Sequence, residues 1–146
     1  MDPDLVLVIF LLLLSALSSA SETALISLSP AQVRTLVEAH KPGANYLAKL
    51  KQQHHKTLIL ILVWNNFVNI AASALTTVYM TERFQSAGVW IATGVLTFFI
   101  LIFGEILPKS LATAYPKRIG QLVAGPLYYI GVITTPIIWL LDLFVN

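Results

Sequence analysis

The sequence predicts an all-α integral membrane protein. Of its 146 residues, 57% are hydrophobic and only 11% are charged, whereas a soluble domain carries about 25% charged residues. The apolar residues are contiguous rather than scattered, and about 20 of them are enough to cross the hydrocarbon core of a bilayer. We therefore predict a single transmembrane domain, residues 1–146, with three transmembrane helices, short cytoplasmic amphipathic helices and a kinked juxtamembrane belt helix.

Three apolar runs predict the transmembrane helices, at residues 1–28, 57–80 and 88–107. A cleaved signal peptide is the alternative for the first run, because Ser18-Ser19-Ala20 resembles a cleavage site. The first residues of this run are acidic rather than basic, and apolar residues resume after Ala20, at Ala24 to Leu28, which a discarded leader does not require.

The basic residues predict the orientation. Five lie between the first two runs and three follow the third, while Arg83 lies elsewhere. The positive-inside rule then places both regions in the cytoplasm and the N-terminus outside, in a multi-pass protein of the plasma membrane. The chain has no cysteine, which excludes disulfides and thiolate metal sites. Its net charge of +2 gives no reason to expect nucleic-acid binding.

Residues 29–56 and 108–146 are predicted to lie at the cytoplasmic surface. Pro30 after Ser29 is a helix start, and the spacing of apolar residues in 29–56 indicates two short amphipathic helices. Pro126 and Pro136 interrupt the last apolar run, which favours a kinked helix wrapping the bundle over a full fourth crossing. The first option leaves the C-terminus in the cytoplasm, and the second places it outside.

Polar side chains recur at intervals of three and four in the first two predicted spans, so they share a helix face in each, and the third span also holds polar residues. They are Ser15, Ser19 and Glu22 in the first span, Asn65, Asn69, Ser73 and Thr76 or Thr77 in the second, and Thr93, Thr97 and Glu105 in the third. Amide and carboxylate groups are costly in lipid and indicate a polar interior, although each residue alone could simply hold helices together.

The third span adds a backbone ligand. In an α-helix Pro108 cannot donate to the Gly104 carbonyl, which is left free to bind something else. Hydroxyl, amide, carboxylate and carbonyl oxygens together form the ligand set of a hard cation such as Mg²⁺ or Ca²⁺. Counted from Gly88, however, Glu105 falls nearer the cytoplasmic end than Asn65 and Asn69, so a tilted or longer helix would be required.

Three segments resemble the transmembrane domain of the CorC/cyclin M magnesium transporter family, and they occur in the family's order. They are Ser21-Glu22-Thr23-Ala24-Leu25, Asn65-Asn66-Phe67-Val68-Asn69 and Ile102-Phe103-Gly104-Glu105-Ile106-Leu107-Pro108-Lys109. The resemblance implies a homodimer in the bilayer, a belt-like juxtamembrane helix, one Mg²⁺ site per subunit and export of Mg²⁺ coupled to Na⁺. The family's cytosolic CBS domains have no counterpart in these residues.

The resemblance also implies which residues bind the ion. The expected metal ligands are Ser15, Ser19, Asn65, Asn69, Gly104 and Glu105, and the expected secondary or structural positions are Glu22, Ser73, Pro108 and Lys109. We expect transport by alternating access and no enzymatic activity. A passive divalent-cation channel and a non-transporting membrane anchor remain the alternatives. An intramembrane serine protease is disfavoured because no histidine lies at membrane depth to act as its base.

Overall fold

The computed structural model describes residues 2–145, and all of its regular elements are helices. In chain order these are α1 (Pro3–Ser27), α2 (Pro30–Glu38), α3 (Ala44–Gln52), α4 (His54–Phe84), α5 (Ser86–Phe99), the π-helix η1 (Ile100–Ile106), α6 (Leu107–Ala114) and α7 (Pro116–Val145). The predicted all-α membrane fold is therefore confirmed.

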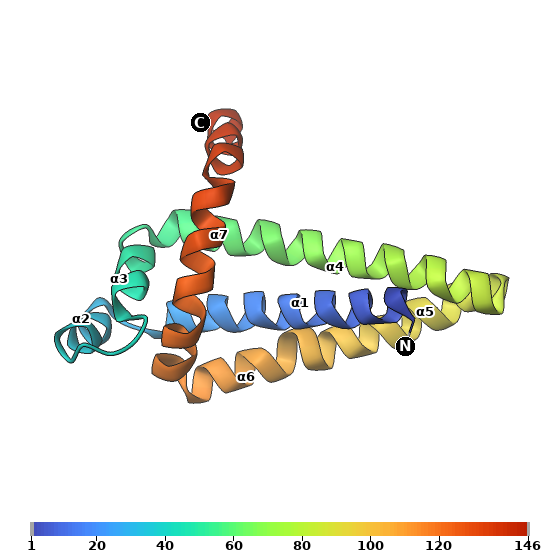
Figure 1. The fold of residues 1–146 in the computed structure, drawn as a ribbon, viewed down its shortest axis with the longest axis horizontal. Helices are drawn as coiled ribbons and strands as arrows, with labels where there is room; N and C mark the ends of the chain where they lie inside the picture. The colour runs from blue at the N-terminus through green and yellow to red at the C-terminus, as the bar shows by residue number, and fades with distance from the viewer. Residues whose placement is uncertain (1, 146) are drawn as a thin grey trace.

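Three long helical stretches run side by side and form the body of the molecule (Figure 1). α1 lies between α4 and the stretch formed by α5, η1 and α6, and it packs against both. Large apolar side chains such as Leu13, Phe67 and Trp90 point away from these contacts and are exposed. Exposed apolar surface of this kind suits lipid, since hydrocarbon is as good a solvent for leucine as a protein core is.

The third stretch is longer than the sequence predicted. It is helical from Ser86 to Ala114 rather than ending at residue 107, and its centre is wound as a π-helix over Ile100–Ile106. The Leu107 amide donates to the Ile102 carbonyl, five residues back, as the wider π register requires. Pro108 follows at the start of α6, where an α-helix tolerates proline.

The short helices α2 and α3 lie at one end of the bundle (Figure 1). Ser29 caps α2, since its hydroxyl accepts from the Gln32 amide while the Gln32 side chain accepts from the Ser29 amide. Lys51 of α3 donates to the Leu25 carbonyl, one of the last carbonyls of α1. A cation at this position complements the negative end of the helix dipole, so α3 closes the end of α1.

The fourth apolar helix, α7, lies across the ends of the other three rather than alongside them (Figure 1). By length and composition four helices could cross a membrane, one more than the three predicted. α7 continues through Pro126 and Pro136 and packs mainly on α1 and α3. Helices that cross the same bilayer are tilted by about 20° on average from its normal. The crosswise course of α7 therefore agrees with the predicted belt.

Candidate metal centre

The middle of the bundle holds a polar cluster that joins α1 to α4. The Ser15 hydroxyl is buried and donates to Asn69 Oδ1 at 2.7 Å, and Asn65 Oδ1 lies 3.3 Å from the same hydroxyl. Asn65 and Asn69 lie one turn apart on α4, so both amides reach the same point on α1. Three side-chain oxygens thus converge between two helices.

Gly104 brings the third stretch to the same point. It is buried, and a Cβ added to it would lie 3.1 Å from the Ser15 hydroxyl oxygen. Because glycine has no Cβ, the backbone of η1 approaches Ser15 here without displacing its hydroxyl. The depth difficulty noted for Glu105 does not arise in the structure, because Asn69 lies 16 residues before the turn at Gln85 and Gly104 lies 19 residues after it, so both reach the level of Ser15.

The π-helix was not predicted, and it lies at this cluster. A π segment inserts one extra residue into a helical turn, and such segments are frequent at functional sites. In this wider register each backbone amide donates to the carbonyl five residues earlier. Pro108 has no amide hydrogen, so the carbonyl that it leaves without a donor is that of Phe103 rather than that of Gly104. The only sequence signal was the Gly104 and Pro108 pair, which interrupts regular hydrogen bonding in either register.

Ser19 lies one turn from Ser15, on the side nearer α7. It is completely buried, and its hydroxyl has no hydrogen-bond partner among the described residues. Leaving a buried hydroxyl unpaired costs about 1–3 kcal/mol, so a ligand would relieve a real penalty here. Glu105 follows Gly104 directly and is half-buried. It forms no ion pair within residues 2–145.

Two expected secondary residues have structural partners instead. Glu22 lies 3.8 Å from the Lys109 ammonium, and both side chains are well exposed. This pair joins α1 to α6 away from Ser15. Pro108 is buried at the start of α6.

Ser73 lies outside the cluster because its position on α4 rotates away from α1. Two steps of four residues from Asn65 turn a helix by about 80°, and Ser73 is exposed. Thr76 lies seven residues from Asn69, a rotation of only about 20°, and it is buried with an unpaired hydroxyl. Thr76 rather than Ser73 therefore continues the polar stripe.

The cluster can bind a cation through neutral oxygens but not through a cage of carboxylates. Within residues 2–145 no three His, Asp or Glu side chains come together. The available donors are serine hydroxyls, two amide oxygens and the Glu105 carboxylate, which follows Gly104 directly. These are hard oxygen ligands, which suit Mg²⁺ or Ca²⁺ rather than a thiolate-seeking metal.

Comparison with known proteins gives a family match. Residues 6–146 match the family described as the cyclin M transmembrane N-terminal domain. A UPF0053 protein of Haemophilus influenzae is 40% identical over 95% of this chain and 33% of its own length. The UPF0053 inner membrane protein YfjD of Escherichia coli is 37% identical over 88% of this chain and 30% of its own. A UPF0053 protein of Synechocystis is 34% identical over 98% of this chain and 42% of its own. The chain thus spans only 30–42% of the length of these relatives.

Proposed function

This chain belongs to the cyclin M transmembrane domain family, and from that premise we propose that it transports Mg²⁺ across the plasma membrane. The cluster described above would bind the ion after it sheds water, through Ser15, Ser19, Asn65, Asn69 and the Gly104–Glu105 segment. The observation that supports this most directly is the convergence of Ser15 with both asparagines at the level of Gly104.

The hydrogen bonds within the cluster suggest how an ion would bind. The Ser15 proton lies between two amide oxygens, where a cation would otherwise lie. If Mg²⁺ entered, the Ser15 hydroxyl would keep its proton and rotate so that its oxygen lone pairs faced the ion, and the two amide oxygens would bind the ion instead of accepting from the hydroxyl. The hydrogen bonds therefore hold the ligands together in the absence of the ion, which limits the rearrangement that binding requires.

The charge of the site favours release. Glu105 is the carboxylate nearest to the cluster in sequence, so a bound divalent ion would leave a net positive charge in a medium of low dielectric. Such a site binds modestly, as a transporter requires. We propose that inward movement of Na⁺ drives export of Mg²⁺ by alternating access, with the N-terminus outside and the C-terminus in the cytoplasm. A homodimer is the proposed assembly.

Binding is tested by thermal unfolding in detergent with increasing Mg²⁺. Wild type should be stabilised in proportion to the logarithm of the ion concentration, and Asn69→Ala and Glu105→Gln should lose most of this stabilisation. Ser73→Ala is the matched control, since it removes an oxygen from the exposed side of α4. Equal stabilisation of wild type, Asn69→Ala and Glu105→Gln would contradict the proposed site.

Transport is tested separately with the protein reconstituted in liposomes that contain a Mg²⁺-sensitive dye. Mg²⁺ movement against its gradient that requires an opposing Na⁺ gradient supports coupled export. Flux that only follows the Mg²⁺ gradient, with or without Na⁺, would identify a passive channel. Absence of flux together with unaltered folding in Asn65→Ala would identify an anchor whose asparagines only join helices.

A further inference from the structure

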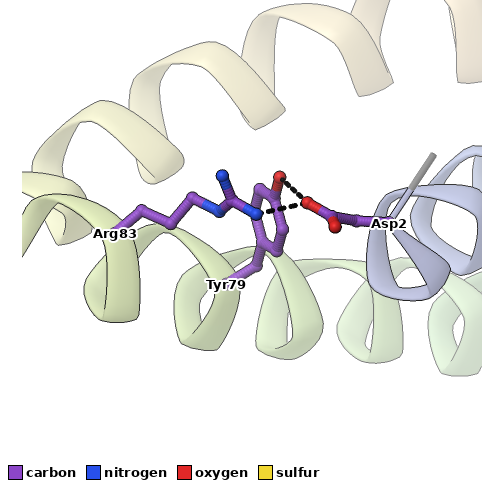
Figure 2. A network of polar contacts seen from close by, with 3 residues as sticks. All are labelled: Asp2, Tyr79 and Arg83. Carbon is purple, nitrogen blue, oxygen red and sulfur yellow. Dashed lines mark hydrogen bonds and ion pairs between the residues drawn. The ribbon is translucent and has the colours of Figure 1, made fainter.

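A second polar cluster joins α1 to α4 at the end of the bundle farthest from α7. Asp2 precedes α1, and its carboxylate oxygen Oδ2 accepts from the Tyr79 hydroxyl at 3.0 Å and from the Arg83 guanidinium (Figure 2). Arg83 also lies over the Tyr79 ring, 4.9 Å from its centre. One carboxylate from α1 is thus held by two side chains of α4, and we call these three residues the latch.

The latch and the metal centre lie on the same seam between the two helices. α1 and α4 run antiparallel, and the seam is held by Ser15 with Asn69 at its middle and by Asp2 with Arg83 at its end. Asp2 and Ser15 are 13 residues apart on one side of this seam, and their partners Arg83 and Asn69 are 14 residues apart on α4, so the two separations are nearly equal. Both helices therefore keep one register over this distance.

An apolar layer lies between the two polar clusters. Leu11 and Ala72, one turn from Ser15 and Asn69 on the latch side, pack together with Val68, which lies beside Asn69, and all three are nearly inaccessible to solvent. No hydrated ion can pass such a layer while it is closed, because nothing in it replaces the ion's water. The metal centre is therefore sealed from the latch end of the bundle in this structure.

Beyond the apolar layer lies the buried hydroxyl of Thr76, which the metal centre does not use. It lies between Asn69 and Arg83 on α4, on the face that meets α1 at both positions. Thr77, Thr81, Thr93 and Thr134 each donate to a carbonyl of their own helix, whereas Thr76 Oγ1 has no partner within residues 2–145. Ser19 has the same property on the α7 side of Ser15. An unpaired hydroxyl thus lies on each side of the central cluster along one seam.

We propose that the α1–α4 seam is the route of the ion toward the latch end, and that the latch holds this route closed. The inference rests on the proposed transport of Mg²⁺. Opening the route requires Asp2 to leave Arg83 and Tyr79 and the apolar layer to separate, which exposes Thr76 as the next oxygen after Asn69. The freed Asp2 carboxylate would then attract the departing divalent cation, and its return to Arg83 would close the route again.

The chain contains no cysteine, so a single Thr76→Cys variant reports accessibility of the seam directly. In lipid nanodiscs, where both faces are open to solvent, a membrane-impermeant maleimide should label Thr76→Cys slowly. Adding Asp2→Asn should raise the labelling rate by about tenfold, since it removes an ion pair and weakens a hydrogen bond that hold the closed state. Adding Tyr79→Phe, which keeps the ring beneath Arg83, should raise it by less.

Two controls separate opening of the seam from general loosening. Asp4→Asn removes a neighbouring first-turn carboxylate that forms no ion pair in the described chain, and it should leave labelling unchanged. Ala24→Cys places a thiol at a fully buried position near the other end of α1, where Asp2→Asn should not increase labelling. Exchanging the charges, with Asp2→Arg and Arg83→Asp together, should restore slow labelling.

The outcomes distinguish this inference from the proposed function. If Asp2→Asn leaves Thr76→Cys as slowly labelled as before, or if it raises labelling of Ala24→Cys equally, the latch does not control the seam and the inference is overturned. Mg²⁺-dependent thermal stabilisation of Asp2→Asn is measured alongside, and it should persist because the metal centre is intact. If Asp2→Asn speeds the labelling of Thr76→Cys but Mg²⁺ does not raise the unfolding temperature of wild type, the latch is supported and Mg²⁺ binding is contradicted.

Discussion

Gly104→Ala separates the contribution of the metal centre from that of the fold. The added Cβ would lie 3.1 Å from the Ser15 hydroxyl oxygen, 3.5 Å from a methyl carbon of Leu12 and 3.7 Å from a methyl carbon of Ile100. The two carbon contacts are ordinary. Only the contact with the Ser15 oxygen is too close, so the hydroxyl must shift by a few tenths of an ångström or change rotamer.

The expected effect on stability is small because two terms oppose one another. Replacing glycine by alanine within a helix gains about 1 kcal/mol. Disturbing the Ser15–Asn69 hydrogen bond costs about 0.6 kcal/mol, the average for a side-chain hydrogen bond between membrane helices. We therefore expect the unfolding temperature without ions to change by no more than a few degrees, since 1 kcal/mol shifts a domain of this size by about 2–4 °C.

The expected effect on ion binding is larger and depends on the ion. Mg²⁺ requires nearly ideal octahedral geometry at about 2.0–2.1 Å, whereas Ca²⁺ accepts about 2.3–2.6 Å and variable geometry. Displacement of one ligand should weaken Mg²⁺ binding by about tenfold and Ca²⁺ binding by less. The apparent preference for Mg²⁺ over Ca²⁺ should therefore fall.

The assay is thermal unfolding in detergent, titrated with each ion, with affinities taken from the concentration dependence of the unfolding temperature. Gly94→Ala is the matched control, because a Cβ at that position of α5 meets nothing within 4 Å. It should leave both affinities unchanged. Unaltered Mg²⁺ affinity in Gly104→Ala would refute the assignment of this position to the ion site, as would an equal loss in Gly94→Ala.

Three further predictions concern the end of the bundle near α7. Glu22→Gln should lower the free energy of unfolding by about 0.5 kcal/mol or less, because its ion pair with Lys109 is exposed, and it should leave Mg²⁺ stabilisation intact in the same titration. Burial lowers the pKa of Lys51 from its ordinary value of 10.5. As the pH rises, the ammonium group of Lys51 therefore loses its proton at a lower pH in the folded chain than in the unfolded chain. Its free energy of unfolding should therefore rise with pH between the two pKa values, and Lys51→Met should remove that rise from a pH series of unfolding measurements. Gly43→Ala should destabilise the protein by about 2 kcal/mol or more, measured by chemical unfolding, because Gly43 has φ of +76° and its Cβ would lie 2.4 Å from the Gln121 carbonyl oxygen.

Hydropathy and helical spacing predicted the helical body of this molecule correctly. Long uncharged runs are sufficient to identify the helices, since their backbone hydrogen bonds are local. The end of the third stretch was predicted too early, because Lys109 and Ser110 lower the hydropathy of a helix that nevertheless continues to Ala114. Apart from the Gly104 and Pro108 pair, nothing in the sequence indicated the π turn.

Helical spacing also predicted part of the candidate site. Intervals of three and four placed Ser15, Asn65 and Asn69 on facing sides of their helices, and the structure joins them. The interval of four also placed Ser73 on that stripe, where the accumulated rotation carries it to the outside of α4. The latch was not predicted, because a contact between Asp2 and Arg83 depends on the antiparallel register of α1 and α4.

The packing of α7 has a mechanical consequence. Gly120 of α7 packs closely on Leu28, which lies just past the end of α1, since a Cβ added to Gly120 would lie 2.8 Å from the Leu28 side chain. The next residue of α7, Gln121, packs on Gly43, which precedes α3. Lys51 in turn ties α3 to the end of α1. A force that swings α7 is therefore transmitted to α1, the helix that carries Ser15 and Ser19. The crosswise helix has the form of a lever arm, and sliding α1 by a fraction of a turn would suffice to pull Ser15 out of register with its two amides.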